Sequence, residues 1–282
     1  MRVGYYPGCS LDSSAREMGE SFWDLLQGIG VEGVELDDWN CCGSSPAHST
    51  HHGWALKLAM RNLLLAEEQG LGELLVMCPS CFVRLREGAR TVQGDEQKAG
   101  EVKETFGRHY GGSVRLRFFL EVLRDLGLEA LRGMVKRPLE GVRGALYYGC
   151  LLSRPEWITG FDVGPYEGFL EELFRSLGGE VVHWGYSRQC CGAHLGVTKP
   201  GLVSNLVDRI REHARRAGSN CLVVFCPLCQ MNLEMRGQRE TPLPVLYITE
   251  LMGLAAELPK APGWMARHLV DPRPMLRSLK IL

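Results

Sequence analysis

The chain has no long hydrophobic run, no excess of charge of either sign and no nucleotide-binding motif. Its most apolar stretch, 242–259, is interrupted by Glu250 and bounded by prolines, so the sequence predicts no membrane span. The net charge of −1 over 282 residues argues against nucleic acid as a partner, because nucleic-acid-binding domains usually carry a basic excess. A G-x-G-x-x-G after a strand, a P-loop and a ferredoxin-type cysteine run are all missing, so we expect no NAD, flavin or nucleotide in this chain.

A secretory signal is also not evident. The N-terminus runs directly into strand-like residues and a cysteine, without a charged segment followed by an apolar one. The expected location is therefore the cytoplasm. In a reducing compartment, organised cysteines more often bind metal or carry out redox chemistry than form a disulfide scaffold, and this chain has 11 of them.

Ten of the eleven cysteines form two sets of five in the same order and with similar spacing. The first follows C-x31-CC-x35-C-x2-C and the second C-x39-CC-x34-C-x2-C. The flanking residues repeat as well, since "VGYYPGC" matches "ALYYGC" and "ELLVMCPSC" matches "CLVVFCPLC". The first cysteine set is Cys9, Cys41, Cys42, Cys78 and Cys81, and the second cysteine set is Cys150, Cys190, Cys191, Cys226 and Cys229.

This repeat predicts an α/β fold of two pseudo-symmetric lobes related by internal duplication, each a small parallel sheet wrapped by helices. We expect lobes at 1–135 and 143–282 with a linker at 136–142. Strands are predicted at 3–6, 32–36, 73–77, 145–148, 179–183, 221–225 and 244–247. Helices are predicted at 13–28, with Ser13 or Ser14 as the cap, at 50–69, and within the polar stretch 91–113.

Each cysteine group follows a predicted strand and precedes a predicted helix. In open parallel sheets, ligands bind at the carboxyl ends of the strands, so the five sulfurs of a lobe are expected to converge there. Adjacent cysteines such as Cys41 and Cys42 are poor disulfide partners for each other, because neighbouring Cα atoms lie about 3.8 Å apart and disulfides usually need about 4.4–6.8 Å. The sulfurs are therefore predicted to hold something outside the pair.

Five soft ligands in each lobe favour an iron–sulfur centre. Structural zinc takes four ligands, commonly from two C-x2-C pairs, and each lobe has one such pair. A cubane cluster is also satisfied by four thiolates, so a fifth indicates a cluster of less usual shape, for example one in which a sulfur bridges two irons; the ligand count fixes no geometry. A thioredoxin-like dithiol would use only the C-x2-C pairs and leave six matched cysteines unexplained. Zinc and dithiol chemistry stay open as alternatives.

These motifs resemble those of the heterodisulfide reductase B-subunit family, whose members have two cysteine-rich domains that are often called CCG domains. The likeness extends over nearly the whole chain. It lies in "YYPGCSLD", "NCCGSS", "MCPSCF", "LYYGCLLSRP", "YSRQCCGAHLGVTKP", "VVFCPLCQMNLEMR" and "ITELMGL". Two complete five-cysteine motifs in this order are highly specific to the family.

The resemblance implies two noncubane [4Fe–4S] clusters and makes the ten cysteines catalytic through them. One cluster would be held by Cys9, Cys41, Cys42, Cys78 and Cys81, and the other by Cys150, Cys190, Cys191, Cys226 and Cys229. The implied reaction is the two-electron cleavage of a disulfide lying between the clusters, each sulfur being captured by iron of one cluster. In methanogens that disulfide joins coenzyme M and coenzyme B.

The resemblance also implies partners. A ferredoxin-like C subunit of a heterodisulfide reductase-like complex would supply electrons, and a flavin-bearing A subunit would lie beyond it. The chain is accordingly expected to be part of an oxidoreductase that acts on a sulfur group. Nothing in the sequence fixes a particular disulfide or thiol as the substrate. The alternative function is therefore electron transfer within another CCG-containing complex, quinone- or sulfur-linked, without disulfide reductase activity.

Four further residues are candidates for the site. His48 and His194 lie shortly after the double cysteines and could donate a proton to a departing thiolate, with a capping or hydrogen-bonding role as the alternative. Arg188 and Lys199 flank the second double cysteine and could contact an anionic substrate group, or compensate cluster charge, or simply face solvent.

Three other features have simpler interpretations. Cys221, outside both sets, is predicted to be a buried core residue. His51 and His52 lie near His48 and share its interpretation. The tail from Lys260 onward carries five Lys or Arg against Asp271 and is interpreted as a docking or capping segment, or as a plain surface tail.

Overall fold

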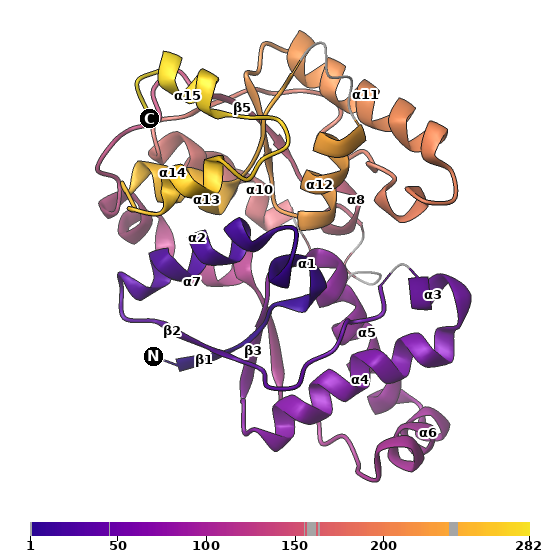
Figure 1. Ribbon diagram of the computed structural model, residues 1–282. Coiled ribbons are helices and arrows are strands. Elements are labelled where there is room, and N and C mark those ends of the chain that lie inside the picture. Colours follow the sequence, from indigo (N-terminus) through magenta and orange to yellow (C-terminus); the bar gives the residue numbers. More distant parts are fainter. Residues whose placement is uncertain (1, 45, 155, 157–161, 163, 237–241) are drawn as a thin grey trace.

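The computed structural model describes residues 2–44, 46–154, 156, 162, 164–236 and 242–282. It has two lobes, one above the other in Figure 1, each built on a four-stranded parallel sheet. The strand orders are β2-β1-β3-β4 and β6-β5-β7-β8, so the two sheets have the same topology. The predicted fold class, two similar α/β lobes with parallel sheets, is confirmed.

The strands are short and the helices between them carry most of the chain. The strands are β1 (Arg2–Tyr6), β2 (Glu32–Glu35), β3 (Glu73–Val76), β4 (Arg115–Phe118), β5 (Arg143–Tyr147), β6 (Glu180–Val181), β7 (Cys221–Val224) and β8 (Val245–Tyr247). The first-lobe helices are α1 (Gly8–Asp12), α2 (Arg16–Gln27), α3 (Pro46–Thr50), α4 (His52–Glu68), α5 (Pro79–Gly94), α6 (Glu96–Phe106) and α7 (Phe119–Gly133). The second lobe has α8 (Gly149–Leu152), α10 (Gly164–Ser176), the 3-10 turn η1 (Ala193–Leu195), α11 (Pro200–Arg216), α12 (Pro227–Arg236), α13 (Ile248–Ala255), α14 (Ala261–Met265) and α15 (Arg273–Ser278).

The two sheets are in matching register. Gly4 of β1 pairs with Val34 on one side and Leu74 on the other, while Gly144 of β5 pairs with Val181 and Cys221. The central strands are apolar and mostly buried, as expected for parallel strands covered by helices on both faces. Within the described residues, none of the helices combines the length and the apolar character needed to span a lipid bilayer.

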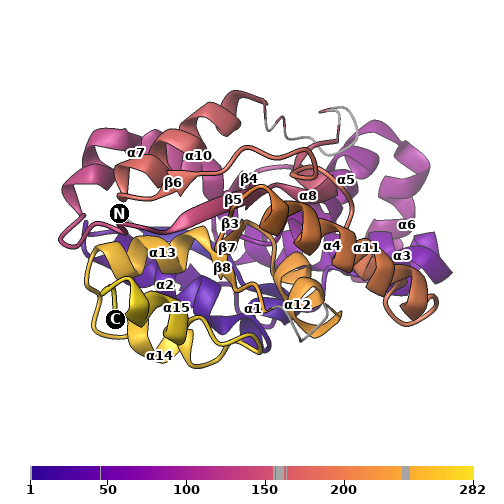
Figure 2. The same cartoon turned by 90° about the horizontal axis from the view of Figure 1, so that it is seen from above.

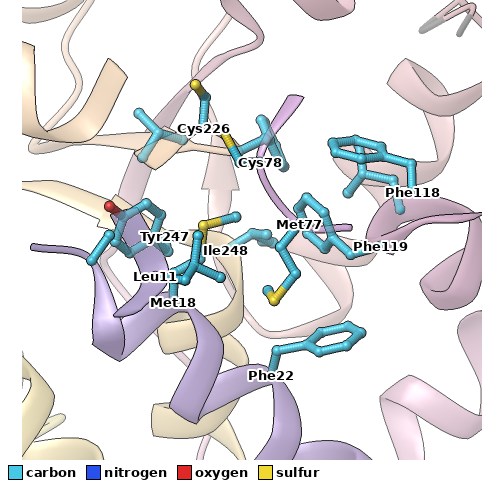
Figure 3. Packing of buried hydrophobic residues seen from close by; sticks show 14 of the residues in the cluster. Leu11, Met18, Phe22, Met77, Cys78, Phe118, Phe119, Cys226, Tyr247 and Ile248 are labelled. Atoms are coloured by element: carbon cyan, nitrogen blue, oxygen red, sulfur yellow. The ribbon is translucent and has the colours of Figure 1, made fainter. Parts of the chain in front are cut away.

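The lobes pack through two pairs of helices related by approximate two-fold symmetry. Helix α2 of the first lobe packs on α13 of the second, and α10 of the second packs on α7 of the first (Figures 1 and 2). Figure 3 shows Met18 and Phe22 of α2 beside Ile248 of α13 in the apolar centre. Buried Ser21 donates a hydrogen bond to Thr249 Oγ1 at 2.8 Å. Because one apolar cluster spans both lobes, their relative placement is fixed by packing.

Three details of the sequence-based prediction were wrong or incomplete. The expected cap of the helix at 13–28 is absent, because α2 starts at Arg16 after Ala15 and has no side-chain cap. Ser13 instead donates to the carbonyl oxygen of Cys9 at 2.5 Å. Strand β4 was not foreseen, and residues 91–113 divide between the end of α5 and the shorter helix α6.

The segment 136–142 packs against the second lobe. The backbone N–H groups of Lys136 and Arg137 both donate to the carbonyl oxygen of Ala255, at 2.8 and 2.9 Å. Leu139 and Val142 are fully buried. The lobe boundaries at 135 and 143 remain our proposal, with a connection that is ordered by these contacts.

The C-terminal tail crosses back onto the first lobe. Lys260 pairs with Asp24 at 2.9 Å, and Glu20 accepts hydrogen bonds from Trp264 and Arg267 at 3.0 and 2.9 Å. All these acidic partners lie on α2. The basic residues of the tail therefore fasten the second lobe to the first, which corresponds to the capping interpretation.

Glu17 on α2 lies at this lobe interface and is only 5% exposed. Burial, with the nearby charge of Glu250, raises its pKa to about 7. A carboxyl group with a raised folded-state pKa stabilises the fold fully below its unfolded pKa and loses that contribution as the pH rises through the folded value.

We therefore expect Glu17→Gln to be more stable than the parent at pH 8, by on the order of 1–3 kcal/mol, with the difference vanishing near pH 4.5. Anaerobic urea unfolding at both pH values, with matched iron content, measures it. Glu104→Gln, at an exposed position of α6, is the control and should leave the free energy of unfolding unchanged at both pH values. A destabilised Glu17→Gln protein at pH 8 would refute this account of the interface.

Candidate functional site

The cysteines lie at the carboxyl ends of the strands in both lobes. Cys9 and Cys150 are in the short helices α1 and α8 that follow β1 and β5. Cys78 and Cys226 come directly after Met77 and Phe225 at the ends of β3 and β7, and Pro79 begins α5. The structure therefore places each cysteine group between a strand and a helix.

The sulfurs of each set approach one another without forming disulfides. In the first set, Cys41 Sγ lies 4.0 Å from Cys9 Sγ, and Cys42 Sγ lies 3.4 Å from Cys81 Sγ. In the second, Cys191 Sγ lies 3.7 Å from Cys229 Sγ, and Cys190 is hydrogen-bonded to Cys150. All eleven cysteines are free thiols. Each lobe thus presents several converging sulfur ligands.

The two sets meet at the centre of the lobe interface. Figure 3 shows Cys78 and Cys226 side by side, one from each lobe, above the apolar side chains of α2 and α13. A hydrogen bond from Cys226, followed by one from Cys81, lowers the pKa of Cys78 well below its usual range. Groups held by the two sets would consequently be close neighbours.

A buried tyrosine holds each double-cysteine loop. Tyr6 donates a hydrogen bond to the carbonyl oxygen of Asn40 at 2.8 Å, and Tyr147 donates to the carbonyl oxygen of Gln189 at 2.5 Å. Both acceptors immediately precede the double cysteines. Since both tyrosines end a central strand, the same contact fixes each loop at the edge of its sheet.

Hydrogen bonds to sulfur favour thiolates, the form that binds metal. The hydrogen bond from Cys150, together with the N–H of Gly192 at 3.3 Å, lowers the pKa of Cys190 to about 5. In the first lobe, hydrogen bonds from Cys42 and Cys9 hold the pKa of Cys41 far below its ordinary value. These hydrogen bonds therefore favour the thiolate at Cys41 and Cys190, while they raise the pKa of their partners Cys42 and Cys150.

Gly8 leaves the space that the first cysteine set needs. Its φ is +66°, and a Cβ there would lie 3.1 Å from Cys81 Sγ. Gly149 is its counterpart, with φ +68° and a Cβ position 3.3 Å from Cys229 Sγ. A side chain at either position would strain the backbone and crowd a ligand sulfur.

We expect Gly8→Ala to lower the iron bound by the first cysteine set, in addition to a backbone cost of about 1–2 kcal/mol. Gly70→Ala is the matched control, because Gly70 has φ +67° but open space around its Cβ position. Iron per chain and the unfolding midpoint are measured for both. Equal iron in the two variants would show that Gly8 matters for its backbone angle alone.

A cavity of about 200 Å³ lies between the lobes at the second cysteine set. All five cysteines of the second set line it and none of the first does. The first lobe contributes a polar wall of Ser44, His48, Ser49, Ser80 and Arg84. Tyr148 also lines the cavity, and its buried hydroxyl has no hydrogen-bond partner among the described residues. The two cysteine sets therefore differ in their access to this cavity, although the sheets of the two lobes have the same topology.

Arg84 and His48 are in contact in the cavity wall. Arg84 Nη1 lies 2.8 Å from Nδ1 of His48 and 2.6 Å from Glu87 Oε2. A guanidinium group has only donors, so the contacted ring nitrogen of His48 is an acceptor and the ring is neutral in this arrangement. Burial and then the charge of Arg84 lower the pKa of His48, in agreement with this protonation state.

The other predicted site residues divide between the cavity and its surroundings. His194 lines the cavity beside the second set, as His48 does from the first lobe. Arg188 instead forms an exposed ion pair with Glu167, and Lys199 lies at the start of α11; neither lines the cavity. An anion-binding role for Arg188 and Lys199 has no support from their positions.

His51, His52 and Cys221 do not line the cavity. His51 accepts a hydrogen bond from the backbone N–H of Trp54 and caps α4, while His52 lines a neighbouring hollow that shares His48 and Arg84 with the cavity. Cys221 is fully buried, and burial raises its pKa to about 12. The prediction that Cys221 is a core residue is confirmed.

Sequence reasoning missed Arg84 and Tyr148. Arg84 lies three residues after Cys81, so helical spacing alone would place it beside a ligand cysteine. Tyr148 precedes the Gly149-Cys150 pair. That both residues line the same cavity is visible only in the folded chain, where the two lobes pack against each other.

The grouped cysteines suit an iron–sulfur cluster. Among the described residues, no three His, Cys, Asp or Glu side chains are arranged to hold one metal ion. A cluster of several irons spans more space, and its ligands are cysteine thiolates. Converging sulfurs, thiolate-stabilising hydrogen bonds and the space left by Gly8 and Gly149 all suit such a group.

The fold and site define a two-lobed, cysteine-rich protein with one five-cysteine site in each lobe. The pattern of the cysteine-rich domain (CCG) matches residues 3–86 and 145–234. The chain belongs to this family, as a member with two copies of the domain.

Curated relatives match it over nearly its full length. It is 29% identical over 275 residues to the 8-methylmenaquinol:fumarate reductase membrane anchor subunit of Wolinella succinogenes, covering 95% of this chain and 96% of that protein. It is 28% identical over 272 residues to the B subunit of the ferredoxin/F(420)H(2)-dependent CoB-CoM heterodisulfide reductase of Methanosarcina acetivorans, covering 90% and 89%. The resemblance to the B subunit that was recognised in the sequence is confirmed.

A solved structure of a hypothetical protein from Helicobacter pylori has the same fold. It superimposes with a TM-score of 0.74 over 96% of this chain at 13% sequence identity. This chain spans about half, 52%, of that protein's length. At this identity the similarity establishes the two-lobed fold alone.

Proposed function

We propose that the chain is an oxidoreductase subunit that reduces a disulfide at two iron–sulfur clusters, one held by each cysteine set and both of noncubane [4Fe–4S] type. The observation that carries the proposal is the meeting of two complete five-cysteine sets at Cys78 and Cys226, beside a cavity open to a small molecule. The clusters would supply electrons and bind sulfur. Relatives named as heterodisulfide reductase subunits support this proposal.

The reaction is R–S–S–R′ + 2 e⁻ + 2 H⁺ → RSH + R′SH. Electrons come from a partner, for which a ferredoxin-like subunit followed by a flavin-bearing one is our proposal. His194 lines the cavity at the second set and is our candidate proton donor. His48 is neutral while it contacts Arg84, so it can take part only after that contact opens.

A second candidate is electron transfer to or from a quinone in a multi-subunit complex. It is favoured by the relative from Wolinella succinogenes, which is matched over 96% of its length and is named as a subunit of a menaquinol-linked enzyme. With this function the cavity would face the quinone side of the electron path, and no sulfur–sulfur bond would be cleaved.

The two functions differ in what the purified protein does without its partners. We expect the anaerobic protein, supplied with a reduced viologen, to oxidise the viologen when a small heterodisulfide is added and not when a soluble menaquinone analogue is added. Thiols should also change the EPR spectrum of the oxidised protein. Turnover with the quinone alone would establish the second candidate in place of the first.

A further inference from the structure

The cavity receives one permanently charged side chain from the lobe opposite the second cysteine set. Among its lining residues, His48, Arg84 and His194 can carry positive charge, and only Arg84 is charged at every physiological pH. Its side chain is 19% exposed, so it lies largely out of bulk water. Its helix, α5, starts at the first cysteine set, yet Arg84 lines the cavity of the second.

The equivalent position of the second lobe is not charged. Arg84 follows Cys81 by three residues, and Asn232 follows Cys229 by three. Asn232 is buried and donates a hydrogen bond to the carbonyl oxygen of Cys191 at 2.7 Å, within its own lobe. The duplication therefore places a charged side chain at this position of the first lobe and a structural amide at the same position of the second.

Two neighbours hold Arg84 in place. Glu87, one turn further along α5, pairs with it at 2.6 Å, and His48 contacts it from α3 at 2.8 Å. Glu87 is 52% exposed, so water screens its charge more than that of Arg84. Because Arg84 lines the cavity and Glu87 does not, the pair presents its positive end to the cavity.

We propose that Arg84 is a charge-stabilising residue contributed by the first lobe to the redox centre of the second cysteine set. Each electron that enters a thiolate-bound cluster adds a negative charge, and a fixed cation in a partly desolvated wall favours that charge. Net charge around a cluster is one of the determinants of its reduction potential. Arg84 thus makes the second centre easier to reduce than it would be without this charge, and so favours electron arrival at the cavity, where an anionic thiolate or hydroquinone product forms.

The test is an anaerobic redox titration of the full chain, followed by EPR. Arg84→Gln is expected to shift the midpoint potential of one of the two centres to a more negative value and to shift that of the other centre less. Arg84→Lys keeps the charge and should stay near the parent. Arg90→Gln, at an exposed position of the same helix, is the matched control and should shift neither centre.

A second variant, whose expected shift in midpoint potential has the opposite sign, keeps the proposal testable if Arg84→Gln does not fold. Glu87→Gln removes a partly compensating negative charge and should shift the same centre to a more positive value, by less than Arg84→Gln shifts it down. Unchanged potentials in both Arg84→Gln and Glu87→Gln would overturn the proposal, as would equal shifts of both centres.

The role of Arg84 rests on the proposed function in one respect, that the second set holds a redox-active cluster. It does not depend on the substrate. If the protein fails to reduce disulfides but Arg84→Gln still lowers one midpoint potential, the role of Arg84 stands and the disulfide assignment falls. If disulfides are reduced and neither variant shifts a potential, the disulfide assignment stands and the role of Arg84 falls.

Discussion

Replacing Cys191 with alanine is expected to remove about half of the iron from the anaerobically purified protein. Cys191 is buried at 3% exposure, with its sulfur 3.7 Å from Cys229, and it belongs to the second cysteine set alone. Removing one thiolate from a set that needs five leaves an iron without its ligand and a cavity in the wall of the site. Cys42→Ala, at 2% exposure in the first set, should remove the other half.

The matched control is Cys221→Ala. Cys221 is equally buried but lies outside both sets, so this variant should keep its full iron content while losing some stability from the small cavity. Iron and acid-labile sulfide per chain, together with the EPR signals of each variant, measure the outcome. Full iron in Cys191→Ala and Cys42→Ala would mean that fewer than five cysteines bind in each lobe.

Replacing His268 with alanine is expected to cost about 3–5 kcal/mol of stability, because it leaves two buried carboxylates without their partner. His268 contacts Glu234 and Glu250 at 2.9 Å each, and all three side chains are almost inaccessible to water. Burial alone would lower the pKa of His268, but the charges of Glu250 and Glu234 outweigh it and raise the pKa to about 11. The charged imidazole links the C-terminal tail to α12 and α13.

The pH dependence has a defined sign. A histidine whose pKa is raised from 6.5 to about 11 stabilises the fold fully below pH 6.5 and loses that contribution as the pH rises toward 11. The gap in unfolding free energy between the parent and His268→Ala should therefore narrow between pH 7 and pH 10. His109→Ala, at an exposed position, is the control. A gap below about 1 kcal/mol at pH 6 would show that the carboxylates find other partners.

The sequence predicted the repeated core of the fold because the repeat is local. Apolar runs such as 73–77 and 221–225 are followed at once by a cysteine, a proline and a helix in both lobes, so strand, turn and helix could be assigned together. Strand β4 was missed because Arg115 and Arg117 interrupt its apolar pattern. Those arginines pair with Glu73 on the neighbouring strand, a contact that only the folded sheet creates.

The candidate site was predictable to the level of its ten cysteines and of His48 and His194, which line the cavity. Strand ends meet at one edge of a parallel sheet, so the grouping within each lobe followed from the topology. The contact between Cys78 and Cys226, the opening of the cavity at one set and the role of Arg84 all depend on how the lobes dock. Docking is decided by packing of α2 on α13 and of α7 on α10, between residues far apart in the chain.

Arg188 shows that a residue close to the cysteines in sequence need not line the cavity. Its position two residues before the second double cysteine left three interpretations open: contact with an anionic substrate group, compensation of cluster charge, or exposure to solvent. In the folded chain Arg188 forms an ion pair with Glu167 of α10. The arginine that lines the cavity is Arg84, from the other lobe. The sequence pattern predicted the candidate ligand cysteines, whereas the charge at the cavity comes from a residue far away in sequence.

Mössbauer spectroscopy of the anaerobically purified, iron-57-enriched protein, with metal analysis of the same sample, shows whether each cysteine set holds an iron–sulfur cluster. We expect about eight irons per chain, in two clusters whose spectra differ from those of cubane [4Fe–4S] centres and change when a thiol or disulfide is added. About one zinc per lobe with little iron, or a single cluster per chain, would contradict this expectation.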